Sequence, residues 1–168
     1  MNDQARIALQ VIALGCGATA TIDLWAVIRA RLLGVPVLNY GLVGRWLGHL
    51  ARGTFRHVAI AAATPVRGER IAGWIAHYLI GIAFAGALFA IWGAGWIRHP
   101  TLGPALAVGL GSSVAPFLVL QPGMGLGVAA SRAPRPGVAR LHTLVTHAVF
   151  GVGLHVTGLL VSGVRSYL

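Results

Sequence analysis

The chain has 168 residues, of which 57% are hydrophobic and 10% are charged, and its formal net charge is +10. A soluble domain of this length exposes more surface than so few charged side chains can cover. The composition therefore excludes a soluble enzyme. The high hydrophobicity excludes a disordered tail, and the single cysteine excludes a secreted disulfide scaffold. Together these features indicate a protein that is surrounded mostly by lipid.

The positive charge comes entirely from 13 arginines, which Asp3, Asp23 and Glu69 oppose. A nucleic-acid-binding surface would place such charge on a solvated face, interleaved with aromatic or polar residues. Here the arginines lie between long apolar runs, which is typical of topology signals and lipid-headgroup contacts, so no nucleic-acid partner is expected. The one cysteine, Cys16, lies inside an apolar run and has no second cysteine at disulfide or metal-ligand spacing.

Four apolar stretches are long enough to cross a bilayer as helices, because a hydrocarbon core requires about 20 apolar residues in a helix. Glycine and proline inside them are tolerated where neighbouring helices pack closely. The sequence predicts an all-α polytopic membrane protein, a four-transmembrane-helix bundle that forms a single integral membrane domain over residues 1–168. Its expected partner is the lipid bilayer, and a homo-oligomer or a membrane partner protein is left open. The spans are expected at about 7–28, 71–92, 102–120 and 141–161.

The segment at 40–52, between the first two spans, is predicted to form a short amphipathic helix. Its apolar residues fall on one helical face and its basic residues on the other. We expect this helix to lie flat on the inner leaflet and to contact lipid headgroups. The alternative is a helix packed against the cytoplasmic end of the bundle. The residues assigned to the surface helix are Arg45, Trp46, His49 and Arg52.

The distribution of arginine predicts the orientation in the membrane. Seven arginines lie between the first two spans and three between the last two, whereas Arg6, Arg98 and Arg165 lie on the opposite side. Positively charged loops stay in the cytoplasm, so both termini are expected in the periplasm of a bacterial inner membrane. Tryptophans near the boundaries should form aromatic belts, and they are Trp25, Trp74, Trp92 and Trp96.

Each span carries small or polar residues at four-residue spacing, which places them on one helix face. In the first span these are Gly15, Thr19 and Asp23. Small faces let helices approach closely, so that polar groups meet protein instead of lipid. An ionised Asp alone in the hydrocarbon region is costly, so Asp23 is expected to be protonated, hydrated or paired, with a His of a neighbouring helix or Arg29 as the partner. The predicted intramembrane polar layer consists of Asp23, His77, His147 and His155.

Three functions are compatible with such a layer. We favour a hydrogen-bonded lock that fixes helix packing in a structural or accessory membrane component. The second is a proton relay or cation site in a transporter or channel. The third is a haem-binding redox subunit with His77 and His147 as axial ligands. The sequence contains no metal-ligand cluster, catalytic residue or conventional enzyme signature that we recognise, and the haem is the only cofactor considered.

An internal repeat relates the second and fourth spans. In both, an Arg is followed seven residues later by a His and four residues after that by a Gly. Because each unit of the repeat would contain two spans, we expect two helix pairs that face the same way across the membrane. The residues concerned are Arg70, His77 and Gly81 in the second span and Arg140, His147 and Gly151 in the fourth.

Several local motifs, taken together, resemble a known bacterial family. The most specific is Val43-Gly44-Arg45-Trp46-Leu47-Gly48-His49, and the others are Asp23-Leu24-Trp25, Ala76-His77-Tyr78, Gln121-Pro122-Gly123 with Ala129-Ala130-Ser131, and His147-Ala148-Val149-Phe150-Gly151. In this order the chain resembles the integral membrane proteins grouped as domain of unknown function 2938 (DUF2938), over nearly its whole length. The resemblance implies a small bacterial inner-membrane protein and supplies no catalytic residues.

Overall fold

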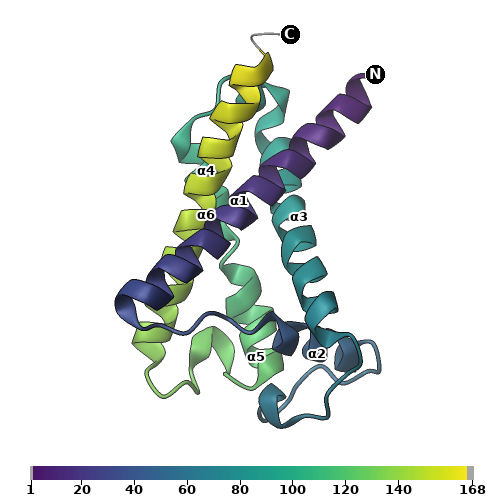
Figure 1. Cartoon of the computed structure of the whole chain (residues 1–168), viewed down its shortest axis with the longest axis vertical. Coiled ribbons are helices and arrows are strands. Elements are labelled where there is room, and N and C mark those ends of the chain that lie inside the picture. Colours follow the sequence, from purple (N-terminus) through teal and green to yellow (C-terminus); the bar gives the residue numbers. More distant parts are fainter. Residues whose placement is uncertain (1, 166–168) are drawn as a thin grey trace. The chain divides into compact units, whose positions relative to one another are not determined.

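The computed structural model describes residues 2–165, with side chains to residue 163. All regular secondary structure in this range is helical, as the sequence predicts, and Figure 1 labels the helices in chain order. The α-helices are α1 (Asp3–Leu33), α2 (Tyr40–Leu50), α3 (Glu69–Arg98), α4 (Leu102–Gly111), α5 (Gln121–Met124) and α6 (Pro136–Arg165). The shorter elements are the 3-10 helices η1 (Ile60–Ala62) and η3 (Val128–Ala130) and the π-helix η2 (Pro116–Leu120).

Four helical stretches are long and apolar enough to cross a membrane, which confirms the prediction of an all-helical protein with four such helices. They are Asp3–Leu33, Glu69–Arg98, Leu102–Met124 and Pro136–Gly163. The first begins after Asn2, whose side-chain oxygen accepts a hydrogen bond from the Ala5 amide at 2.8 Å, and ends at Gly34 with a left-handed φ of 63°. These are ordinary helix caps, and they let α1 extend beyond the apolar run at both ends.

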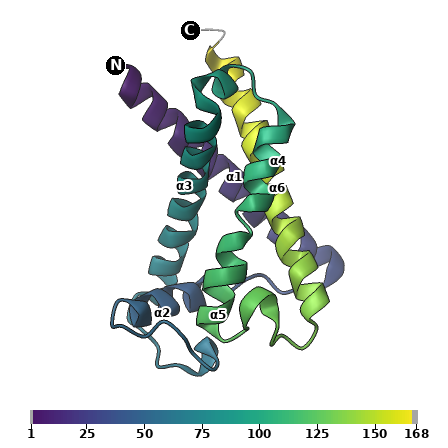
Figure 2. The ribbon, with the colours of Figure 1, turned by 180° about the vertical axis from the view of Figure 1, so that it is seen from behind.

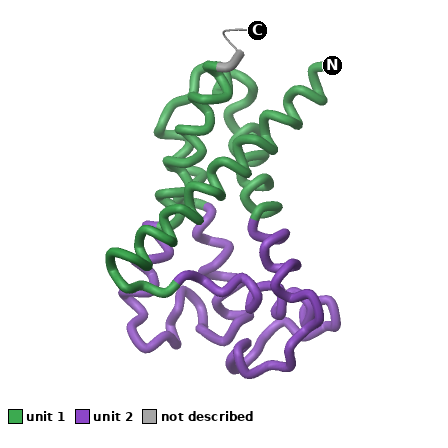
Figure 3. Tube along the Cα trace, viewed as in Figure 1, with its two compact units in different colours: residues 1–36, 78–111, 146–168 green, residues 37–77, 112–145 purple. Residues whose placement is uncertain are grey.

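The chain divides into two compact units, which Figure 3 colours separately. Unit 1 comprises residues 1–36, 78–111 and 146–168, and so contains α1, most of α3, α4 and most of α6. Unit 2 comprises residues 37–77 and 112–145, and so contains α2, α5, the three short elements and the first turns of α3 and α6.

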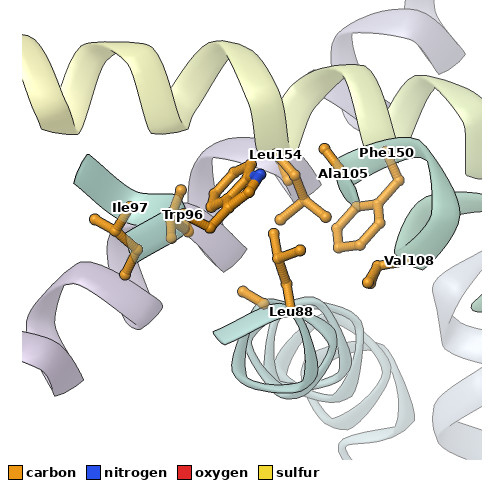
Figure 4. Close-up of a cluster of buried hydrophobic side chains, with 10 residues drawn as sticks. Leu88, Trp96, Ile97, Ala105, Val108, Phe150 and Leu154 are labelled. Carbon is orange, nitrogen blue, oxygen red and sulfur yellow. The ribbon is translucent and has the colours of Figure 1, made fainter. Parts of the chain in front are cut away.

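An apolar core holds unit 1 together, and its buried residues come from α1, α3, α4 and α6. Figure 4 shows Leu88 of α3 facing Phe150 and Leu154 of α6. Phe84 packs edge-on against Phe150, with ring centroids 6.4 Å apart. Because lipid is as apolar as these side chains, close packing rather than removal from water supplies most of their contribution.

Glycines bring the helices of unit 1 into backbone contact. A Cβ added at Gly15 of α1 would overlap the backbone of Ile82 in α3, and one added at Gly109 of α4 would overlap the backbone of Gly151 in α6. Both glycines belong to the small-residue faces predicted from the sequence, and both are buried. These faces are therefore the helix contact surfaces, as expected.

Unit 2 is organised by α2, which packs on the first turns of α3. Gly44 of α2 lies against the Glu69 carbonyl group and Gly73 of α3 against the Tyr40 carbonyl group, so closely that neither position has room for a Cβ. Trp46, buried together with Ile60 and Met124, forms the apolar cluster of this unit. The helix predicted at 40–52 is thus present, ending two residues early at Leu50.

Trp96 lies in the core, so its expected place in an aromatic belt is wrong. Its side chain is 5% exposed and its indole N–H donates to the Thr101 carbonyl oxygen at 3.1 Å, whereas Trp92 is 40% exposed. The cause is Gly93, whose φ of 70° and ψ of −177° interrupt α3 before its last residues. Glycine adopts this backbone conformation readily, and the change of direction buries the indole.

The third span is interrupted, where the sequence predicts one continuous helix. The α-helix α4 ends at Gly111, and the π-helix η2 leads from Pro116 into α5, as the view from behind shows (Figure 2). Pro116 has no backbone N–H to continue an α-helical ladder, and a π turn accommodates such a position. Ser112 and Ser113, which lie in the break, are both buried.

The two halves of the predicted repeat make corresponding contacts. In the first helix pair, Gly81 of α3 lies against Thr19 of α1, and in the second, Gly151 of α6 lies against Ala105 of α4. The 3-10 helices η1 and η3 precede α3 and α6 in the same way. These similarities support a duplicated helix pair.

Replacing Gly15 with Ala should lower the free energy of unfolding by about 1–3 kcal/mol, because the Ile82 backbone must move to admit the new Cβ. Gly86→Ala is the matched control, since its Cβ would meet only Val11 Cγ1 at an ordinary 3.8 Å. Thermal unfolding in detergent micelles measures both variants. Equal stability of Gly15→Ala and wild type would contradict the tight contact between α1 and α3.

Candidate intramembrane polar site

A carboxylate and a phenol meet inside unit 1, within the predicted membrane spans. Tyr78 Oη of α3 donates a hydrogen bond to Asp23 Oδ2 of α1 at 2.9 Å, and both side chains are half-buried. Burying a carboxylate away from water without a hydrogen-bond donor is strongly unfavourable. The phenol supplies such a donor from the helix packed against α1.

The sequence positions this pair through the spacing of small residues on the two helices. Gly15, Thr19 and Asp23 follow one another at four-residue intervals on α1, while Tyr78 precedes Gly81 by three residues on α3. The glycines fix where α1 and α3 cross, so Asp23 and Tyr78 lie on the surfaces of the two helices that face each other. Thr19 is satisfied within its own helix, because its Oγ1 donates to the Gly15 carbonyl oxygen at 2.7 Å.

Tyr78 is the site residue that the sequence analysis missed. Tyrosine side chains are common at membrane boundaries, so its identity alone gave no signal. Its position gave a signal, because Tyr78 lies three residues before Gly81 and four before Ile82, and both of these α3 residues contact α1. Asp23 was expected to pair with a histidine, which stays a prediction, and the hydrogen bond described above gives it a tyrosine hydroxyl as a partner.

His77, the residue before Tyr78, belongs to unit 2 and lies in an aromatic cluster. Its ring stacks on that of Tyr40, with centroids 4.1 Å apart and an interplanar angle of 26°. Trp74 lies edge-on to the imidazole at 5.8 Å and contacts Tyr40 at 4.6 Å. These rings hold the imidazole between α2 and the first turns of α3.

The two histidines of α6 in unit 1 have different surroundings. His147 forms a hydrogen bond with the backbone of Gly109, whose Cα lies against the backbone of α6. His155, two helical turns further along, has a buried Nδ1 atom without a hydrogen-bond partner. The four residues of the predicted polar layer are thus divided between units 1 and 2, with three of them in unit 1.

The basic face of α2 is engaged by unit 2 itself. Arg45 Nε donates to Glu69 Oε2 at 2.9 Å and Arg45 Nη2 donates to Glu69 Oε1 at 2.8 Å, which makes a bidentate ion pair. Arg45 Nη1 donates to the carbonyl oxygens of Ala61 and Ala63, both at 3.0 Å. The hydrogen bond to Glu69 raises the pKa of Arg45, which keeps the guanidinium charged. Its donors are therefore used within the protein.

The remaining residues assigned to the surface helix divide between buried and exposed positions. Trp46 is buried, and its indole N–H donates to the Phe55 carbonyl oxygen at 2.8 Å. His49 Nε2 lies 2.9 Å from the Thr64 carbonyl oxygen, whereas Arg52 is exposed. These contacts favour the alternative of a packed helix, and contact with lipid headgroups stays a prediction.

A metal centre is not evident in the part of the chain that the structure describes. No group of three or more His, Cys, Asp and Glu side chains in that part is arranged to hold a metal ion. The chemistry available at Asp23 and Tyr78 is hydrogen bonding and proton exchange between a carboxyl group and a phenol.

The family model described as "Protein of unknown function (DUF2938)" matches residues 12–161, a range that contains every residue of the polar site. The chain therefore belongs to this family, which confirms the resemblance found in its motifs. No curated protein and no solved structure matches the chain.

The hydrogen bond between Asp23 and Tyr78 can be tested with a double-mutant cycle. Asp23→Ala and Tyr78→Phe should each lower the free energy of unfolding, and their effects should be non-additive by about 1 kcal/mol because each removes the same contact. Chemical or thermal unfolding in micelles measures the coupling. Asp3→Ala combined with Tyr78→Phe is the control, because Asp3 lies near the start of α1 and pairs with Arg6. Additive effects in the Asp23 cycle would refute the contact.

Proposed function

We propose that this member of the DUF2938 family is a structural or accessory component of a bacterial inner membrane, in which an intramembrane hydrogen bond fastens α1 to α3. The observation that carries the proposal is the 2.9 Å contact from Tyr78 Oη to Asp23 Oδ2. Polar contacts of this kind stabilise helix association in lipid, where competing water is scarce.

The surroundings of the pair support a fastening role. Gly15 and Gly81 lie so close to the opposite helix that neither position accommodates a Cβ, which leaves no room for water in the contact beside the pair. The hydroxyl groups of Thr19 and Thr21 donate to carbonyl oxygens of α1 itself, at 2.7 and 2.9 Å. The two threonine hydroxyl groups on this part of α1 are thus satisfied within their own helix.

Proton or small-cation transport is the second candidate, and two observations favour it. His155 has a buried Nδ1 without a hydrogen-bond partner, and an imidazole with such a nitrogen is suited to hand on a proton. The α-helix of the third span is also interrupted by a turn at Ser112 and Ser113, and interrupted helices are typical of transporter binding sites.

The orientation that we propose places the two long loops in the cytoplasm and both termini in the periplasm. Unit 2 contains parts of both loops, and the His57 amide in the first donates to the Gly123 carbonyl oxygen at the end of the third span, at 3.0 Å. This contact supports a common side for the two loops. Eight of the 13 arginines belong to unit 2, which matches the positive charge typical of cytoplasmic segments.

Proteoliposomes distinguish the two candidate functions. Under the fastening role, Asp23→Asn should keep the acceptor for Tyr78 and retain stability, Asp23→Ala should melt at lower temperature, and neither should change proton or cation flux. Asp3→Asn, at an exposed position, is the charge-matched control. Transport would be established, and the fastening role overturned, by two results together. The wild type would have to show a flux above that of empty liposomes, and Asp23→Asn or His77→Ala would have to abolish that flux without changing stability.

Cysteine labelling tests the orientation. In a Cys16→Ala background, Arg56→Cys and Arg135→Cys should react with a membrane-impermeant maleimide only after spheroplasts are lysed. Thr101→Cys, in the short connection between α3 and α4, should react in intact spheroplasts. Reaction at residue 56 in intact spheroplasts would reverse the proposed orientation.

A further inference from the structure

A cavity in unit 2 lies beside the contact between α2 and the first turns of α3. Its volume is about 520 Å³, within the range of small-molecule sites. Its polar lining includes Asn39, Glu69 and Arg70, and its apolar lining includes Val37, Leu38 and Trp74. The cavity therefore combines a charged part with an apolar part.

The charged part carries an uncompensated cation. Glu69 is already bound by the guanidinium of Arg45 and also accepts from the Val66 amide at 2.8 Å. In the described part of the chain, no hydrogen bond or ion pair engages Arg70, although it adjoins Glu69 in the sequence. Arg70 is an exposed residue at the edge of the cavity, and its guanidinium group, which carries five N–H donors and has no counter-ion, suits an anion.

Asn39 supplies a second donor to the same cavity. Its side-chain oxygen accepts from the Gly41 amide at 3.0 Å and so caps α2, which identifies the other end of the side chain as the NH₂ group. That NH₂ group has no protein acceptor within the described residues. Together Arg70 and Asn39 provide the kind of donors that bind phosphate oxygens.

The walls of the cavity that belong to α2 and α3 are held in place by contacts between these two helices. Gly44 and Gly73 hold α2 and α3 in backbone contact, and the rings of Tyr40 and Trp74 pack with centroids 4.6 Å apart. A site built on two packed helices loses little conformational entropy when a ligand binds.

The position of the cavity relative to the predicted span suits a lipid. Arg70 is the second residue of α3, so it lies at the end of a membrane-spanning stretch where headgroups are found. Val37, Leu38 and Trp74 are 46%, 49% and 39% exposed, which provides an apolar surface for acyl chains next to the donors.

We propose that this cavity binds an anionic phospholipid, with the phosphodiester oxygens on Arg70 and Asn39 and the glycerol and first acyl carbons against Val37, Leu38 and Trp74. The charge balance selects an anionic lipid. A zwitterionic headgroup would bring an ammonium group into a site whose one carboxylate, Glu69, is already paired with Arg45.

Lipid titration of the purified full-length chain in micelles tests this proposal. Phosphatidylglycerol should be retained in native mass spectrometry at concentrations at which phosphatidylcholine is not. Arg70→Gln should weaken retention by about tenfold or more, because it removes a charge-assisted contact. Arg67→Gln is the matched control, since it removes the same charge from an exposed loop residue that does not line the cavity, and it should change retention less than about twofold.

A second variant separates the site from general charge attraction. Asn39→Asp keeps the cap on α2 but replaces the NH₂ donor with a repelling oxygen, so it should also weaken retention by about tenfold. Equal losses in the Arg67 and Arg70 variants, or wild-type retention by Arg70→Gln, would overturn the proposal. The assignment of a lipid as the ligand would be overturned if inorganic phosphate displaced phosphatidylglycerol. It would also be overturned if inorganic phosphate raised the melting temperature as much as the lipid does.

Discussion

At Gly15 the backbone of α1 touches the backbone of α3 at Ile82, and at Gly109 the backbone of α4 touches that of α6. In lipid, apolar side chains gain little by leaving their surroundings, so helices associate through close packing and a few polar contacts. Glycine makes this possible because it removes the side chain that would hold the backbones apart. The arrangement of unit 1 depends on these contacts, and a single added methyl group at either position disturbs them.

The polar groups of unit 1 follow from the same contacts. Once the glycines fix the crossing of α1 and α3, Asp23 and Tyr78 face one another and form their hydrogen bond. His147 likewise meets the Gly109 backbone at the second tight crossing. The fastening role that we propose therefore needs no further element: tight glycine contacts position the groups, and the scarcity of water in the membrane strengthens the bonds between them.

Unit 2 is held together by charged groups, and its arginines greatly outnumber its single acidic residue, Glu69. Arg45 takes both carboxylate oxygens of Glu69 and leaves the adjoining Arg70 without a counter-ion. The same pairing that fixes α2 to the surrounding loop thus leaves Arg70 available for the anionic lipid that we propose. A basic unit of this kind also agrees with the proposed cytoplasmic side, where anionic lipids attract positive charge.

The sequence by itself determined the four apolar spans, the helix after residue 40, the small-residue contact faces and the family. Each of these depends on composition or on spacing within one helix, which local sequence records. Only the tertiary structure decided that Asp23 meets Tyr78, 55 residues away, and that Arg45 meets Glu69, 24 residues away. It also placed Trp96 in the core and interrupted the third span. These outcomes depend on which helices come into contact and on where the backbone leaves the regular α-helix, at Gly93 and at Ser112 and Ser113. Hydropathy and periodicity do not record these features.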